Sequence, residues 1–153
     1  SGTDVVRKIL ILAREAGFKA ACELQGLSIT IERYGATSYQ SGAYLAQRIL
    51  TAPNRPDGVF CATDLIALGF MDTARQSFGL NIPDDLCLMG FDDIEQAGWG
   101  AYQLTTFAQP INEIAARAVK WLSSALVSDG ESATITLDPE LIWRSTMRAA
   151  SLS

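Results

Sequence analysis

The stretch GVFCATDLIALGF, residues 58–70, changes its hydrophobic period at the polar pair Thr63-Asp64. Before the pair lies a short apolar run typical of a buried strand, and after it the apolar residues recur with helical spacing. A strand that passes directly into a helix is half of a strand-helix-strand unit. Because both side chains can accept from the free amides of a helix N-terminus, the pair is either a helix cap or part of a ligand site at a strand end.

The same alternation continues on both sides of this stretch. Apolar spacing predicts a helix of about twenty residues before Gly26, and further helices over 38–52, 64–78 and 110–127. Strands are expected over 27–35, 57–63, 86–91, 104–107, 133–137 and 140–146. Such alternation indicates parallel strands joined by right-handed helical crossovers. The sequence therefore predicts an α/β fold whose mainly parallel sheet is covered on both faces.

Composition excludes several classes of protein. The chain has 153 residues, of which 48% are hydrophobic and 19% are charged, as in one ordinary globular domain. A net charge of -5 argues against binding of nucleic acid by this chain, since its twelve basic residues are scattered and form no cluster for a phosphate backbone. Neither a targeting segment nor a membrane span is recognisable. The three cysteines lack CxxC spacing and are expected to be buried, reduced thiols, which fits a cytosolic setting.

Catalytic machinery is not recognisable in this sequence. It contains no histidine, which removes the commonest general base and most zinc sites, and no phosphate-binding glycine motif follows a strand. Asp92 and Asp93 could do acid-base work, but adjacent residues in an extended chain point in opposite directions. We therefore predict no enzyme, no metal site and no cofactor.

Polar residues gather where strands are expected to end. Thr63-Asp64, Asp92-Asp93 and Gln109 each follow a strand, and Thr37-Ser38 open the second helix. Ligands of open α/β sheets bind beyond the carboxyl ends of the strands. Simpler roles compete with this interpretation, because threonine and aspartate also cap helices and close turns. Arg14 on a helix could likewise be an ordinary solvated charge.

Two long segments resemble the LacI/GalR family of bacterial transcriptional regulators. They are RPDGVFCATDLIALGFMDTARQSFGLNIPDDLCLMGFDDIEQAG and LTTFAQPINEIAARAVKWL, and the likeness is collinear from Arg14 to Arg148. The resemblance implies a fold like type I periplasmic binding proteins, a Rossmann-like three-layer αβα arrangement. The match covers only the C-terminal part of the effector-binding domain, so the chain is expected to be a fragment of that fold.

The resemblance divides the chain into three parts. Residues 1–109 resemble part of the C-terminal effector-binding subdomain, 110–130 a helix of the other subdomain, and 131–153 the crossover with the last strands. The helix would then lack the sheet that it normally covers. Its apolar face must be buried in another way, through exchange between copies or dimer packing. That face comprises Ile114, Ala118, Trp121, Leu122 and Leu126.

Five residues match positions that contact the effector in such regulators. Arg14 matches an arginine directed at effector hydroxyls or carboxylates, and Asp92 in GFDD matches an aspartate that accepts from them. Gln109 matches a residue at the edge of the cleft. Thr63 stands where the family usually has Asn, and Thr37 where many members have a stacking aromatic. Of Thr63 and Asp64, Thr63 is thus the predicted ligand contact and Asp64 the structural cap.

The resemblance also implies partners and a location. A small polar metabolite, in particular a sugar, would be the effector, and homodimers would form through surfaces that include Ser38, Leu68, Met71, Glu95 and Trp99, with domain exchange as one route in this fragment. Operator DNA would be bound only by an N-terminal domain absent from this sequence, in the cytoplasm and without membrane contact. The alternative is a periplasmic solute-binding protein of a sugar transporter, which shares the fold.

Overall fold

The computed structural model describes residues 14–125 and 134–149. Two short strands, β1 (Gly58–Phe60) and β2 (Cys87–Met89), pair in parallel, with Val59 opposite Leu88. A second pair, β3 (Thr106–Ala108) and β4 (Glu140–Ile142), is antiparallel. Parallel bridges from Met89 to Thr105 and from Asp92 to Ala108 connect the two pairs. The α/β class is confirmed, with a parallel centre and one antiparallel neighbour.

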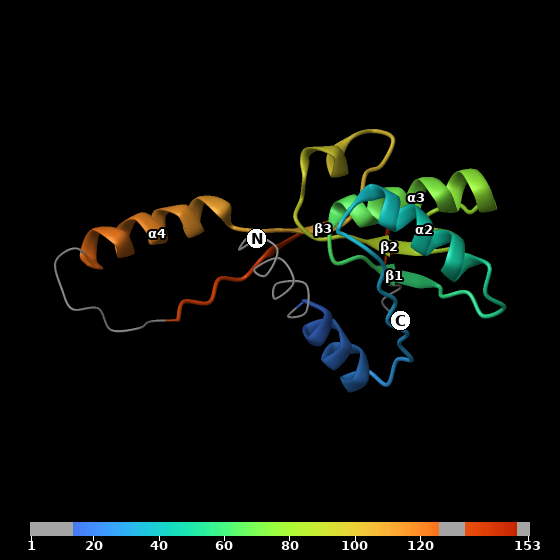
Figure 1. Cartoon of the computed structure of the whole chain (residues 1–153), viewed down its shortest axis with the longest axis horizontal. Coiled ribbons are helices and arrows are strands. Elements are labelled where there is room, and N and C mark those ends of the chain that lie inside the picture. The colour runs from blue at the N-terminus through green and yellow to red at the C-terminus, as the bar shows by residue number, and fades with distance from the viewer. Residues whose placement is uncertain (1–13, 126–133, 150–153) are drawn as a thin grey trace.

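Helices lie on both faces of this sheet. Val59 packs against the buried core, whereas the next residue, Phe60, stacks on Phe18 with ring centroids 4.7 Å apart. Because successive strand residues point to opposite faces, the helix over residues 14–24 and the core helices cover different sides of β1. Figure 1 shows these core helices, α2 (Tyr39–Leu50) and α3 (Asp64–Phe78), running beside each other. The three-layer arrangement expected from the sequence is present.

Two glycines allow α2 and α3 to approach closely. A Cβ at Gly42 would collide with the carbonyl oxygen of Ile66, and one at Gly69 would collide with that of Tyr39. Below this contact, Phe70, Leu88 and Leu104 are almost completely buried. The small residues of ALGF therefore serve packing within the chain.

Local signals explain where the core helices begin and end. Ser38 caps α2, accepting from the amide of Ser41 at 3.1 Å. Gly79 ends α3 with φ 63°, a left-handed conformation that favours glycine. Both boundaries agree with the prediction from sequence. The predicted strands over 57–63 and 86–91 are also confirmed, although both are shorter than their apolar runs.

Helix α4 (Ile111–Ala125) extends away from the rest of the described chain (Figure 1). Residues 134–139 run alongside it without regular structure. Several of its apolar side chains are exposed, among them Ile111, Val119 and Leu122, each by more than 60%. Within the predicted apolar face, Ile114, Trp121 and Leu122 are 44%, 51% and 67% exposed, so the burial expected for this face is not found among the described residues. Leu126 lies outside them.

Two predicted strands are wrong. Residues 27–34 and 134–137 have no regular secondary structure. Both segments carry alternating side chains, but a strand persists only when a neighbouring strand pairs with its backbone. The predicted helix before Gly26 is present over 14–24; its earlier part, and the end of the predicted fourth helix at Val127, lie outside the described residues.

Burial of the cysteines agrees with the sequence prediction. Cys22, Cys61 and Cys87 are all buried free thiols. Burial raises the pKa of Cys61 to about 12, so its thiol stays protonated and inert at neutral pH. No helix within the described ranges is long and apolar enough to cross a membrane.

Candidate functional site

Arg14 and Asp92 form an ion pair at one edge of the sheet. Nη2 of Arg14 lies 3.0 Å from Oδ1 of Asp92, and Nη1 donates to the carbonyl oxygen of Ala62 at 2.8 Å. The guanidinium also lies over the ring of Phe91, 3.8 Å from its centroid. The side chains are 13% and 25% exposed, so the pair is largely shielded from solvent.

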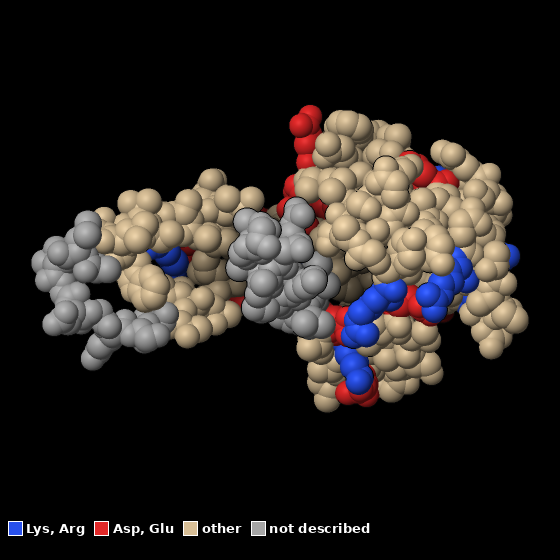
Figure 2. Space-filling view, viewed as in Figure 1, with Lys and Arg blue, Asp and Glu red and all other residues tan. Residues whose placement is uncertain are grey.

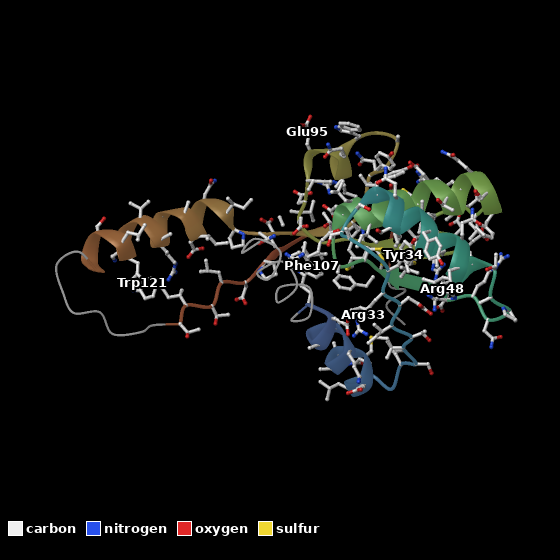
Figure 3. The ribbon with its side chains drawn as sticks, viewed as in Figure 1. Arg33, Tyr34, Arg48, Glu95, Phe107 and Trp121 are labelled. Atoms are coloured by element: carbon white, nitrogen blue, oxygen red, sulfur yellow. The ribbon has the colours of Figure 1, made fainter. Side chains whose placement is uncertain are left out.

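Gln109 completes this cluster from the end of β3. Its amide nitrogen donates to the same Oδ1 of Asp92 at 2.7 Å. The backbone amide of Asp92 donates to the carbonyl oxygen of Phe107 at 2.9 Å, which fixes the loop against β3. Figure 3 labels Phe107 where β3 meets the body of the molecule. The structure thus brings three of the five predicted site residues, Arg14, Asp92 and Gln109, into direct contact.

Thr63 lies beside this cluster with an unused hydroxyl. It is the N-cap residue of α3, yet its side chain makes no capping hydrogen bond. The residue is 9% exposed, and its Oγ1 is buried without a hydrogen-bond partner among the described residues. Arg14 contacts the carbonyl oxygen of the preceding residue, Ala62. The helix-cap interpretation of the Thr63 side chain is therefore wrong, and its buried hydroxyl is unpaired within the part of the chain that the structure describes.

Asp64 is structural, but not as the predicted cap. Its carboxylate is fully buried and accepts from the hydroxyl of Thr106 at 2.6 Å and from the amide of Ile94 at 3.0 Å. Burial raises its pKa, while the bonds from Thr106 and Ile94 oppose that rise. Asp64 therefore joins the start of α3 to the neighbouring loop and strand.

Asp93 points to a different partner from Asp92. Its Oδ1 lies 2.7 Å from Nη2 of Arg144, whose Nη1 donates to the carbonyl oxygen of Leu104. Both aspartates have positive φ, 126° for Asp92 and 52° for Asp93. Neither Arg144 nor Phe91 was predicted from the sequence. No local pattern identified Arg144, which lies 51 residues from Asp93 in the chain.

Thr37, another predicted site residue, is partly buried in the bend before α2. Its neighbour Ser38, predicted to lie at a dimer surface, is partly exposed and caps α2 with its hydroxyl. Thr37 therefore stays a prediction from position alone.

Two predicted interface residues need correction. Leu68 is 3% exposed and Met71 is completely buried, both in the core of this chain. Leucine and methionine on the inner face of an amphipathic helix pack inward, so neither side chain offers surface to a second copy. Glu95 and Trp99 are exposed, with Glu95 projecting at the rim in Figure 3. Ser38 is partly exposed, so three of the five residues predicted for this surface stay accessible.

A separate hollow lies away from the Arg14 cluster. It measures about 460 Å³ and lies between α4 and residue Ile135, lined also by Arg117, Lys120 and Trp121. Trp121 is on the side of α4 that faces the 134–139 segment (Figure 3). This hollow is a gap beside an exposed helix and contains none of the predicted site residues.

Charges on the visible face are mixed. Figure 2 shows basic side chains lying against acidic ones on the lower part of the body, without a continuous basic surface on that face. The pairs include Arg33 with Glu15, and Arg48 with Glu32 at 3.1 Å. Within the described ranges, no group of three metal-binding side chains is placed to hold an ion.

The arrangement at the Arg14 cluster suits binding. Arg14 supplies several donors, Asp92 two acceptor oxygens and Gln109 both kinds of group. The ion pair neutralises itself, so the cluster presents alternating donors and acceptors with little net charge. The three-layer fold, with polar residues beyond the strand ends, is that of a domain of the periplasmic-binding-protein type.

Comparisons with known proteins agree with this class. Residues 6–147 match the family described as a periplasmic binding protein-like domain. A ribose operon repressor from Haemophilus influenzae is 36% identical over 110 residues, which are 71% of this chain and 33% of that protein. The repressor CytR of Escherichia coli is 35% identical over 116 residues, 75% of this chain and 34% of its own length.

Solved structures give the same result. A LacI transcriptional regulator from a Rhodococcus species has a TM-score of 0.76 at 32% identity, covering 88% of this chain and 50% of that one. A LacI family regulator from Enterococcus faecium, solved with bound ribose, has a TM-score of 0.77 at 26% identity, covering 90% and 51%. This chain belongs to the LacI family of transcriptional regulators. It spans about one third of the two repressors named above.

Proposed function

We propose that this chain is the effector-binding and dimerisation part of a LacI-type regulator that senses a small polar metabolite, in particular a sugar. The contact of Arg14, Asp92 and Gln109 carries this proposal. Hydroxyl groups both donate and accept, so a polyhydroxylated ligand can satisfy the arginine and the aspartate together. An uncharged ligand fits a cluster whose charges already neutralise each other.

Thr63 adds a further contact in this proposal. Its buried hydroxyl has no partner among the described residues, which is costly unless something pairs with it. A ligand hydroxyl would remove that cost. Thr37, before α2, is proposed to line the same site from the adjacent loop.

The proposed regulation is a shift between two arrangements of a dimer. An effector that binds one arrangement more tightly increases its population by the difference in affinity. We propose that Glu95 and Trp99, both exposed, and the region around Ser38 belong to the dimer surface. Operator DNA would be bound by another domain of the full-length protein, in the cytoplasm. Residues 1–109 would form part of one subdomain, 110–130 a helix of the other, and 131–153 the crossover.

The relatives favour a regulator over a solute-binding protein or an enzyme. Both curated proteins named above are repressors, although the family description itself covers periplasmic binding proteins. Ribose is bound in the Enterococcus faecium structure, and a repressor of a ribose operon is among the relatives. We propose a sugar of that kind as the first ligand to test.

A thermal-shift screen of the full-length protein tests the proposal. Sugars, sugar acids, polyols and nucleosides would be added to the wild type, Arg14→Ala and Asp92→Asn, because a ligand of the native state raises the apparent melting temperature. Arg55→Ala and Asp57→Asn, on exposed residues, are the matched controls. We expect a sugar-dependent shift that both site variants lose and both controls keep. A shift that survives in the site variants would place the effector elsewhere.

A further inference from the structure

Asp64 has a completely buried carboxylate that is not among the proposed effector contacts. Its Oδ1 accepts from the hydroxyl of Thr106 at 2.6 Å, and its Oδ2 accepts from the amide of Ile94 at 3.0 Å. The described residues provide it with no ion pair. Burying a charge without a cation is unfavourable, so its two hydrogen bonds must compensate.

Asp64 holds the chain on both sides of Asp92 and Asp93. Its backbone amide donates to the carbonyl oxygen of Phe91 at 2.9 Å, and its carboxylate receives the amide of Ile94. Between these two points lie Asp92 and Asp93, both with positive φ. Residues other than glycine keep such a conformation only where the surroundings enforce it. The two contacts of Asp64 thus fix the backbone immediately before and after these two residues with positive φ.

The neighbouring residues are shaped around the same carboxylate. A Cβ added to Gly90 would collide with Oδ1 of Asp64, so the strand end leaves room for this group. Thr106, on β3, lies three residues before Gln109 in the chain. Asp64 therefore links the start of α3, the 91–94 loop and β3. These are the elements that carry Thr63, Asp92 and Gln109.

We propose that Asp64 is a positioning residue of the effector site: its carboxylate, fixed by Thr106, holds the 91–94 loop so that Asp92 faces Arg14 and Gln109. This inference rests on the proposed function for its consequence in binding, but its geometry can be tested without an effector. Asp64 itself contacts no ligand in this account. Its effect on affinity is transmitted through the backbone of the loop.

The test uses the full-length protein and two disruptive substitutions with conservative partners. Asp64→Ala removes both acceptors, whereas Asp64→Asn keeps an acceptor for the amide of Ile94. Thr106→Val removes the hydroxyl at nearly constant shape, whereas Thr106→Ser keeps it. If Asp64→Ala does not fold, Thr106→Val still tests the proposal. Thr146→Val is the matched control, because this threonine is also fully buried and its hydroxyl accepts from the amide of Thr105, outside the 91–94 loop.

Two measurements separate the inference from the proposed function. Hydrogen exchange of the backbone amides of residues 92–94 in the ligand-free protein reports the loop alone. Affinity for the sugar found in the thermal-shift screen reports the site. We expect Asp64→Ala and Thr106→Val to speed exchange and weaken binding by about tenfold or more, since a charged hydrogen bond is lost. The conservative variants should restore both properties, and Thr146→Val should change neither.

Unchanged exchange at residues 92–94 in folded Thr106→Val and Asp64→Ala would overturn the inference, whatever happens to affinity. So would faster exchange with undiminished affinity, because the loop would then not position the site. Faster exchange in a protein whose wild type binds no sugar would support the geometry and count against the proposed function instead.

Discussion

Helices α3 and α4 have the same length, 15 residues each, but the apolar face of α3 is covered and that of α4 is exposed. The inner face of α3, including Phe70 and Met71, is completely buried against α2 and the sheet. The apolar residues of α4, including Val119 and Leu122, face solvent. Periodicity thus specifies which face of a helix is apolar, but the rest of the chain decides whether anything covers that face.

The largest expected effect is in the core beneath α3. Phe70→Ala should lower the free energy of unfolding of the full-length protein by about 3–5 kcal/mol, because the large ring is lost from a site that cannot fully collapse. Chemical denaturation with urea measures this loss. A decrease below about 1 kcal/mol would mean that the α3 core is less tightly packed than the structure shows.

The contact between α2 and α3 should be the next most sensitive. Gly69→Ala should destabilise by about 1–3 kcal/mol, because the new methyl group collides with the backbone carbonyl of Tyr39, which cannot rotate away. Gly58→Ala, where the added carbon meets open space, is the matched control in the same denaturation experiment. Equal effects of the two substitutions would contradict the close crossing of the helices.

Thr63 gives a prediction of opposite sign. Thr63→Val should stabilise the ligand-free protein by about 1 kcal/mol, because it removes a buried hydroxyl that lacks a partner among the described residues. The same change should weaken effector binding if the hydroxyl contacts the ligand. Denaturation without ligand and titration calorimetry with it measure the two effects. A destabilised ligand-free variant would reveal a hydrogen bond that the structure does not show.

Much of the α3 region could be predicted from sequence, because its signals are local. The change of period at Thr63-Asp64, the end at Gly79 and the apolar strand before the helix each depend on neighbouring residues. The family resemblance predicted in addition that Arg14 and Asp92, which are 78 residues apart, belong to one site. The ion pair of Asp93 with Arg144, separated by 51 residues, was missed because neither local pattern nor motif connects them.

The failures fall where the partner of a segment decides its state. Residues 27–34 and 134–137 alternate like strands, yet no strand among the described residues pairs with them and they are irregular. Leu68 and Met71 were assigned to a dimer surface by position, although their place on the apolar face of α3 buries them. In each case the local pattern was read correctly, but the sequence did not show which other part of the chain would lie against that segment.

A substitution on α4 should have the smallest effect on the stability of this chain, and it tests directly whether another part of the protein covers the helix. In the 153-residue chain, Leu122→Ala should change the free energy of unfolding by no more than about 0.5 kcal/mol, because the side chain is 67% exposed. In the full-length protein, where we propose that another subdomain covers this helix, the same substitution should cost about 2–5 kcal/mol. Urea denaturation of both proteins, at several concentrations of the shorter one, makes the measurement. A large, concentration-dependent loss in the shorter chain would show that a second copy covers α4, and a small loss in both would mean that its apolar face is not a packing surface at all.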